Sequence, residues 1–511
     1  MDYNGKRRFE EEEEDDHQSK RNRTYEDDEE LDEEAILRMV EQAPNVEALD
    51  EAQVKKMLLS LEKKITNNQM LRNKFADKPE KFMDSEVELD DELKKMHLLA
   101  TAPEFYPTIA GLGTITSIVS LFTHENTDSE VLTETKATAK LVDSFLENEG
   151  LENLIGNIER MDEDIPEEMK AVHNSLGIIE NLIEVRPDIS ELVTEKTGIM
   201  QYLLKRISKE AFDDNKLYAS EILAILVQES TENQRKLGKL NGMDSMLVAL
   251  SQYRKDNPKD GTEEEVVENL FDALCSCLQE GTSRDLFMEA EGIELMLIMV
   301  KNKKFCRRPA IKVLNYTLTD NKANCNYFVD KLGLKTIFSA FMKKGSKKAK
   351  KGEDNAEDEH IVCCIVNLFR NLDDQSLERL HGKFTENNCE KVERLLELHE
   401  KYTEKLSKAE EELRAEMEEE EVDEEELYLK RLDAGLFTLQ MIDTVIAYIF
   451  GIDATRKRAK DIIDLRGYPI ETFKKVLFEY AQNAGDDSVG EDEPPNATRK
   501  LTRSLLKNFD L

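Results

Sequence analysis

The 511-residue sequence lacks the features that would place it in a membrane or outside the cell. Its N-terminus has no apolar signal region, and its longest apolar-rich stretch, Phe437 to Ile452, contains Asp443 and is too short to span a bilayer. The seven cysteines are an odd number without a regular framework, which favours free thiols in a reducing compartment. We therefore expect a soluble intracellular protein with no membrane partner.

The sequence also has no motif of catalysis or of cofactor binding. No phosphate-binding loop, nucleophile elbow or zinc-protease helix is present, and the pair Gly111 and Gly113 lacks the third glycine and the preceding strand of a dinucleotide site. His360, Cys363 and Cys364 would lie on neighbouring helical positions, but no second pair at zinc spacing accompanies them. Ordinary core thiols are therefore favoured over a metal site. We predict a protein that is not an enzyme, with no catalytic residue, no metal and no cofactor.

Positive charge is scarce, because 71 lysines and arginines are set against 109 aspartates and glutamates, for a formal net charge of −38. The acids concentrate in runs from Glu10 to Asp16, Glu26 to Glu34 and Glu416 to Glu426. Such runs are typical of solvated or disordered segments, with a specific acidic-tail interaction as the alternative. Phosphates repel a chain of this charge, so no direct nucleic acid binding is expected. Partners with basic segments are favoured instead.

Residues 1–34 have almost no apolar content and are predicted to be a disordered acidic tail. Two basic clusters in this tail have the arrangement of a bipartite nuclear-localisation signal, and they consist of Lys6, Arg7 and Arg8, then Lys20, Arg21 and Arg23. The acidic spacer between them weakens the match, so scattered charge is the alternative. A further basic run, Lys343 to Lys351, is predicted as an exposed loop, with phosphate or partner binding as its alternative.

A glycine followed by an apolar helix recurs along the middle of the chain. These glycines are Gly113, Gly150, Gly198, Gly242, Gly292 and Gly333, with spacings between 37 and 50 residues that are typical of armadillo and HEAT repeats. A second apolar helix follows each of the later glycines, at Val172 to Val185, Leu217 to Val227, Val266 to Leu278, Ala310 to Leu318 and Ile361 to Leu372. Polar residues from Gln228 to Arg235 interrupt the helical pattern. No alternating strand pattern of useful length occurs between the helices.

This pattern predicts an all-α, armadillo- or HEAT-like right-handed superhelical solenoid with helical caps at both ends. We predict a cap over 35–99, repeats over 100–400, a charged helix or disordered insertion over 401–426, a C-terminal helical domain over 427–485 and a flexible tail with a last short helix over 486–511. The 3-4 spacing of apolar residues from Val392 to Leu413 fits a short coiled coil or hairpin, or a single exposed helix with one packed edge.

The candidate site is the concave surface that such a stack would form. The second helices carry acids and amides at positions that could line it: Glu180, Asn181, Glu184, Glu221, Glu268, Asn269, Asp272 and Asn371. Amide side chains can bond the backbone of an extended peptide, and carboxylates attract its lysines and arginines. The alternative is that these residues are simply the solvated faces of helices.

Several long strings of the sequence resemble the beta-catenin-like protein 1 family. They are VKKMLLSLEKKITNNQMLRNKFADKPEKFMDSE, MHLLATAPEFY, VHNSLGIIENLIEVRP, NKLYASEILAIL, ENLFDALCSCL, FTENNCEKVERLLELH and LYLKRLDAGLF, and in this order they span about Val54 to Gly485. The resemblance implies an armadillo solenoid in the nucleus. It also implies an accessory scaffold of the spliceosome in pre-mRNA splicing, associated with the Prp-nineteen and Cdc-five-like complex. Binding of basic localisation-type segments and self-association into a homodimer are implied as well.

The sequence departs from related patterns in two places. Importin-type armadillo grooves use recurring tryptophan and asparagine pairs, whereas this chain has no tryptophan and plausible groove asparagines only at Asn181 and Asn371. A nuclear-import-type adaptor is therefore the second hypothesis, and basic segments are expected to bind mainly through charge. The charged stretch from Glu404 to Glu426 matches the family poorly.

Overall fold

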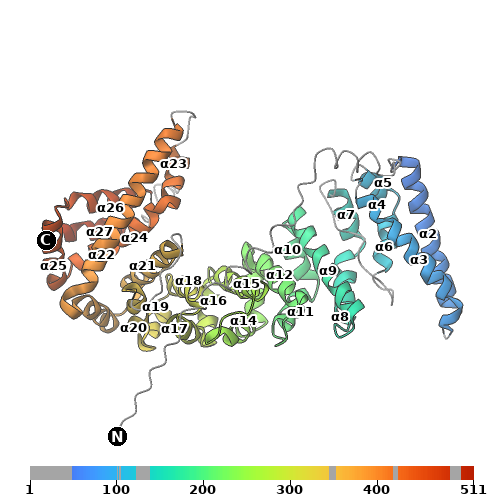
Figure 1. Ribbon diagram of the computed structural model, residues 1–511, viewed down its shortest axis with the longest axis horizontal. Coiled ribbons are helices and arrows are strands. Elements are labelled where there is room, and N and C mark those ends of the chain that lie inside the picture. The colour runs from blue at the N-terminus through green and yellow to red at the C-terminus, as the bar shows by residue number, and fades with distance from the viewer. Residues whose placement is uncertain are drawn as a thin grey trace, which may run out of the picture. The chain divides into compact units, whose positions relative to one another are not determined.

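The computed structural model describes residues 49–76, 78–100, 102, 105–121, 139–343, 353–417, 424–483 and 497–511. All regular structure within these ranges is helical, which confirms the all-α prediction (Figure 1). The predicted tail over 1–34, with both basic clusters of its localisation signal, lies outside the described residues, as does the run after Lys343. Two compact units, Met1–Met57 and Leu58–Leu511, divide the chain. The first is described only from residue 49, where it contributes the start of helix α2 (Glu51–Lys74).

The second unit begins with short helices. These are α3 (Met83–Lys95), α4 (His97–Ala100), α5 (Tyr106–Gly111), α6 (Thr114–Leu121), α7 (Ala139–Glu147) and α8 (Gly150–Arg160). Polar contacts join the end of α2 to α3, since Arg72 pairs with Glu86 at 2.6 Å and the amide of Asn68 donates to Ser85 at 3.2 Å. Buried polar groups that are bonded in this way hold two charged helices together where apolar side chains are few.

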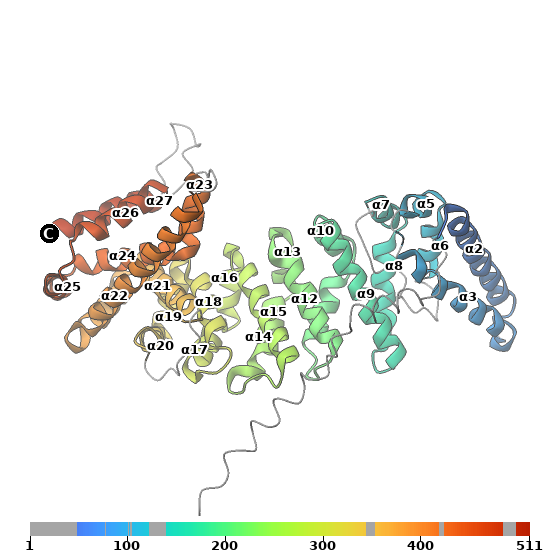
Figure 2. The same ribbon diagram turned by 45° about the horizontal axis from the view of Figure 1, so that its top comes forward.

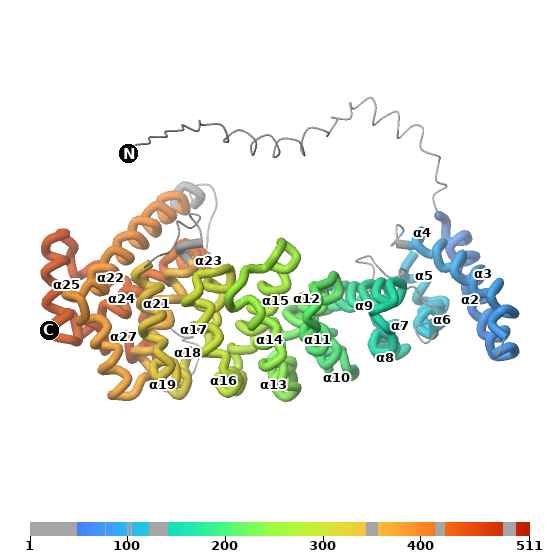
Figure 3. The backbone as a smooth tube through the Cα atoms, turned by 60° about the horizontal axis from the view of Figure 1, so that its bottom comes forward, coloured from blue at the N-terminus to red at the C-terminus, as the bar shows by residue number. Residues whose placement is uncertain are grey.

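From α9 onward the chain repeats a unit of three helices, and each helix packs against its counterpart in the next unit (Figures 1 and 3). The long helices are α9 (Pro166–Val185), α12 (Asp214–Gln228), α15 (Gly261–Cys277), α18 (Arg307–Leu318) and α21 (Glu353–Asn371). The two shorter rows are α10 (Ile189–Lys196), α13 (Thr231–Lys239), α16 (Gly281–Glu289) and α19 (Lys322–Asp330), then α11 (Ile199–Ile207), α14 (Gly242–Ser251), α17 (Gly292–Asn302) and α20 (Gly333–Phe341). This stacking confirms the predicted helical solenoid.

The predicted interruption from Gln228 to Arg235 is shorter than expected, because α12 ends at Gln228 and α13 already begins at Thr231. The hydroxyl of Ser230 caps α13 by accepting a hydrogen bond from the backbone N–H of Asn233 at 3.1 Å. The buried amide of Asn233 donates to the carbonyls of Leu226 and Ser190, at 2.8 and 3.1 Å, and Gln234 donates to Val227 at 2.9 Å. The polar residues therefore satisfy the last carbonyls of α12, which is why a buried helix has a polar sequence.

Gly242, Gly292 and Gly333 begin helices of the third row, and none of these three has a positive φ, unlike Gly113 (φ 76°) before α6. The left-handed conformation lies on the residue before the glycine, at Glu291 (φ 59°) and Leu332 (φ 64°). The glycine itself allows a close approach, because a Cβ at Gly292 would lie 2.5 Å from the ring of Phe287, and one at Gly333 would lie 2.5 Å from Phe328. An aromatic residue five positions earlier thus covers the start of the helix.

We expect Gly292→Ala to lower the free energy of unfolding by about 1–3 kcal/mol, because the added methyl overlaps the Phe287 ring in a packed core. Urea denaturation followed by circular dichroism measures this loss. Gly281→Ala is the matched control, since Gly281 also begins a helix but has no atom within 4 Å of its added Cβ. An equal loss in the two variants would contradict the close-approach argument.

The C-terminal helices pack around α24 (Phe437–Phe450). Helix α22 (Asp374–Met417) breaks its helical conformation from Glu386 to Cys389, and its second half then packs against α24 and α25 (Asp453–Arg466). The apolar residues from Val392 to Leu406 lie on the buried side of this half, which agrees with a single helix that has one packed edge. Residues 401–417 are therefore the end of a long helix. Helix α23 (Glu424–Arg431) and a π-helical turn, Leu432–Leu436, lead into α24.

One helical stretch among the described residues, Glu425–Phe450, is long and apolar enough to cross a membrane. Its apolar window is 72% buried inside the protein, as is typical of a core helix. Its aromatic Phe450 lies against the ring of Phe509, with 4.8 Å between the centroids. This helix forms the centre of the C-terminal packing.

The last short helix that the sequence predicts within 486–511 is present in the structure. Helix α27 (Ala497–Leu506) and a 3-10 turn, Lys507–Asp510, pack against α26 (Glu471–Asn483), with Leu505 and Phe509 buried. Arg499 donates to the carbonyl of Ala481 at 3.0 Å. The apolar residues of this helix recur at i and i+4, so they form one face that packs inward.

Candidate functional site

The predicted site residues all lie on the row of long helices (Figure 2). Glu180, Asn181 and Glu184 are on α9, Glu221 is on α12, Glu268, Asn269 and Asp272 are on α15, and Asn371 is the last residue of α21. Helices α9, α12, α15, α18 and α21 contact one another in this order, so their outward faces form one continuous surface. The structure brings the residues of the first three helices together and leaves Asn371 two helices further along.

The centre of this surface is a row of three carboxylates from successive repeats: Glu180, Glu221 and Glu265. Glu221 is half-buried, and burial together with the charges of Glu180 and Glu265 raises its pKa. The hydroxyl of Tyr218 donates to Glu180, and burial with this contact raises the pKa of the tyrosine. Within the described part of the chain, no lysine or arginine forms an ion pair with any of the three carboxylates. We call these three residues the acidic row.

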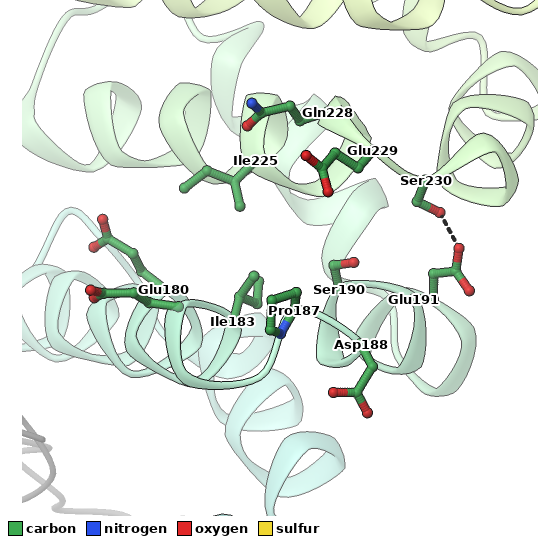
Figure 4. Close-up of a pocket in the computed structure, with 11 residues that line it drawn as sticks. Glu180, Ile183, Pro187, Asp188, Ser190, Glu191, Ile225, Gln228, Glu229 and Ser230 are labelled. Atoms are coloured by element: carbon green, nitrogen blue, oxygen red, sulfur yellow. Dashed lines mark hydrogen bonds between the residues drawn. The ribbon is translucent and has the colours of Figure 1, made fainter. Parts of the chain in front are cut away.

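A pocket of about 560 Å³ adjoins the acidic row at the last turns of α9 and α12 (Figure 4). Its carboxylates are Glu180, Glu184, Asp188, Glu191 and Glu229, and no basic residue lines it. The C-terminal ends of α9 and α12 meet the N-terminal ends of α10 and α13 here, so the helix dipoles oppose one another and the five carboxylates determine the charge of the pocket. The pocket is therefore suited to a cationic group.

Apolar side chains give the same pocket a second property. Ile225 lies on one wall, opposite Ile183 and Pro187 on the other (Figure 4). Two of its acids are already engaged, since Glu191 accepts from Ser230 at 2.6 Å and Asp188 pairs with Arg186 at 2.7 Å. A lysine or arginine side chain fits such a site, because its methylene stem packs on apolar groups while its charged head reaches the remaining carboxylates.

Other predicted residues are used within the protein. Asp272 forms an ion pair of 2.8 Å with Lys312 of the next long helix, which ends the acidic surface at α18. The amide of Asn269 donates to Ser220 at 3.2 Å, and that of Asn371 donates to the carbonyl of Asn367 at 2.9 Å. Asn181 is half-buried and Glu268 is exposed on this surface.

Four acids of the site were missed by the sequence-based prediction: Glu265, Asp188, Glu191 and Glu229. Glu265 lies one helical turn before Asn269, a predicted residue, so helical spacing could have found it. The other three lie at helix ends or in connections, which the repeat pattern places only once the second row of helices is recognised.

His360, Cys363 and Cys364 are packing residues in this structure. Both thiols are buried, and burial raises the pKa of Cys363 to about 12, which leaves little thiolate at neutral pH. Burial also lowers the pKa of His360, whose Nδ1 lies 3.4 Å from the amide nitrogen of Asn315. All seven cysteines are buried and unpaired. Among the described residues, no three histidine, cysteine or acidic side chains are grouped to hold a metal ion.

A family model described as "Catenin-beta-like, Arm-motif containing nuclear" matches residues 34–478. The chain belongs to this family. Human beta-catenin-like protein 1 is 40% identical to this catenin-beta-like chain in an alignment of 490 positions that covers 90% of the chain and 86% of the human protein. The homolog from Schizosaccharomyces pombe is 31% identical in an alignment of 466 positions that covers 87% of this chain and 81% of its own. A solved structure from a study of cadherin and beta-catenin aligns with 93% of this chain at 13% identity and a TM-score of 0.47.

Membership in the catenin-beta-like family confirms the predicted family, the armadillo-type fold and the nuclear location. The protein is therefore a nuclear armadillo protein whose long-helix surface carries a row of carboxylates without an ion-pair partner among the described residues.

Proposed function

We propose that this catenin-beta-like protein is a non-catalytic nuclear scaffold that binds basic segments of partner proteins on its acidic row. The observation that supports it is the half-buried Glu221, held between Glu180 and Glu265 with no cation beside them in the described structure. Following the family resemblance, the partners are splicing factors of the Prp-nineteen and Cdc-five-like complex. The protein is then an accessory component of the spliceosome in pre-mRNA splicing, and it self-associates as a homodimer.

The physical reason is that like charges held together in a half-buried site are costly until a cation arrives. A lysine or arginine of a bound segment removes the repulsion that raises the pKa of Glu221. Hydrogen bonds between ionised partners contribute about 1.5–3 kcal/mol each, more than those between neutral groups. The pocket beside the row holds the next basic side chain of the same segment.

The pH dependence of binding tests the role of Glu221. Because its pKa is raised, Glu221 takes up a proton at a higher pH than an ordinary glutamate, and the affinity for an arginine-rich peptide should fall as pH falls through this raised pKa. Arginine keeps its charge over this range, so the protein alone titrates. Fluorescence anisotropy at constant ionic strength, from about pH 7.5 to about pH 5, measures how the affinity for the peptide changes.

Glu221→Gln is the matched variant for this experiment. It should bind more weakly at neutral pH and lose the affinity change that belongs to Glu221. A wild-type affinity that stays flat with pH and with added salt would contradict the acidic row as the binding surface.

Capture from nuclear extract connects the acidic row to splicing. Tagged wild-type protein should retain splicing factors that a variant of the row does not, as mass spectrometry of the captured proteins shows. Light scattering of the purified chain measures the proposed self-association. An import adaptor would instead bind an import carrier in the same capture, and the sequence, which has no tryptophan, offers no importin-type groove to support it.

A further inference from the structure

Two neighbouring loops carry exposed cations on a chain whose net charge is −38. The first loop joins α14 to α15 and includes the 3-10 turn Gln252–Arg254, and the second joins α17 to α18. Their exposed basic residues, together with the last turn of α17, are Arg254, Lys255, Lys259, Lys301, Lys303 and Lys304. We call these six residues the basic edge. Only two acids, Asp256 and Asp260, lie in the same two segments.

Hydrogen bonds between the two loops hold the basic edge together. The amide of Asn302 donates to the carbonyl of Arg254, and the backbone N–H of Phe305 donates to the side-chain oxygen of Asn257 at 3.0 Å. The 3-10 turn of the first loop also packs against α14 and α17. Cations from two successive repeats are therefore held side by side.

Five of the six cations of this edge have no acidic partner in the part of the chain that the structure describes. Arg254, Lys255, Lys259, Lys301 and Lys304 form no ion pair among the described residues. The carboxylate of Asp260 is already used, since it caps α15 by accepting from the backbone N–H of Glu263 at 2.9 Å. Helix α18 starts at the same edge without an acidic residue in its first turn, so the positive end of its dipole adds to the lysines.

We propose that the basic edge docks an acidic segment of a partner protein. Packed helices lie about 8–10 Å apart, a distance that about three residues of extended chain cover. A run of about six acidic residues therefore reaches the cations of both loops. This surface is separate from the acidic row, and the two would let one scaffold hold a basic and an acidic partner at once.

A protein segment fits this edge better than a nucleic acid does. Five of the six cations are lysines, and neither aromatic ring of the two loops is exposed for a base to stack on, since Tyr253 is buried against Glu263 and Phe305 is half-buried. A long nucleic acid would also pass over the acids that follow on α15, Glu264 and Glu265, and phosphates within a Debye length of about 8 Å would be repelled. A short acidic run stays on the edge.

Binding of a fluorescent peptide EEEEEDD to the full chain tests this proposal at low salt. Lys255→Glu, Lys301→Glu and Lys304→Glu together should reduce its affinity by at least about tenfold, because three exposed charge pairs become repulsive. The control is Lys239→Glu, Lys322→Glu and Lys335→Glu, three exposed lysines of α13, α19 and α20. Both variants change the net charge equally, so the control should bind the peptide nearly as well as the wild type.

The outcomes that would overturn the proposal are distinct from failure of the acidic row. Equal losses in the two triple variants would show a general charge effect, and no binding by the wild type would remove the docking site. Tighter binding of an oligouridylate of the same charge, lost in the first variant, would assign the edge to RNA. Glutamine in place of glutamate in the first variant keeps the test valid if charge reversal impairs folding. Glu221→Gln should leave acidic-peptide binding unchanged.

Discussion

Replacing Glu180, Glu221 and Glu265 together by lysine should weaken the binding of an arginine-rich peptide by about a hundredfold or more. The change removes three attractive charges from three neighbouring helices and adds three repulsive ones at the same place. Each charged hydrogen bond that is lost is worth about 1.5–3 kcal/mol, and even after discounting for the half-exposed site the sum exceeds the 2.8 kcal/mol or so of a hundredfold change. Isothermal titration calorimetry at physiological ionic strength measures it.

The matched control is a second triple variant, Glu195→Lys, Asp244→Lys and Glu289→Lys. These exposed acids lie on α10, α14 and α16, in the two shorter rows of helices. The net charge changes by the same amount in both variants, so long-range attraction falls equally in both. If the control loses as much affinity as the acidic-row variant, net charge alone accounts for binding and the row is not a site.

Much of the fold could be predicted from the sequence because the repeats have similar sequence patterns. The spacing of the glycines and the apolar stripes of the long helices specify which helices stack, and helices α12, α15 and α18 lie within or close to their predicted ranges. The second row was missed because a short helix such as α13 buries Asn233 and Gln234 beside a single large apolar side chain, Leu237. Hydropathy cannot detect a helix whose buried face is satisfied by hydrogen bonds to another helix.

The site was predicted only in part, since neighbouring repeats decide which acids remain free. Asp272 resembles Glu221 in the sequence, yet Lys312 neutralises it from a helix that begins 35 residues later in the chain. Glu221 meets Glu180 and Glu265 instead. This difference depends on the register between packed helices. The periodicity of a single helix in the sequence does not predict that register.

The second large effect is expected on stability, at a buried pair in the C-terminal helices. The pair consists of His399 on α22 and Asp443 on α24. Nδ1 of the histidine lies 2.7 Å from Oδ1 of the aspartate. Either single change, His399→Leu or Asp443→Leu, should lower the free energy of unfolding by about 3–5 kcal/mol, because it leaves the other polar group buried without its partner. Denaturation with urea, followed at the tyrosines, measures the loss.

The double variant distinguishes this pair from ordinary core packing. Two leucines bury no charge, so His399→Leu with Asp443→Leu should cost less than the sum of the single changes, and a double-mutant cycle measures the difference. If the losses in free energy of unfolding of the two single variants add up to the loss of the double variant, the two side chains are not coupled. Additive losses would mean that each side chain acts through its volume alone.

The same pair predicts how stability depends on pH. Burial alone would lower the pKa of His399, but the carboxylate of Asp443 outweighs burial and the pKa is raised. A raised pKa in the folded state means that the contribution of His399 is complete below its unfolded pKa of about 6.5 and is lost as pH rises through the folded value. The wild type should therefore lose stability from mildly acidic to alkaline pH, relative to Asp443→Asn, in which the charge that raises the pKa is gone. Parallel pH profiles for the two proteins would show that the histidine is not charged in the fold, and the contact between α22 and α24 would then rest on a neutral hydrogen bond.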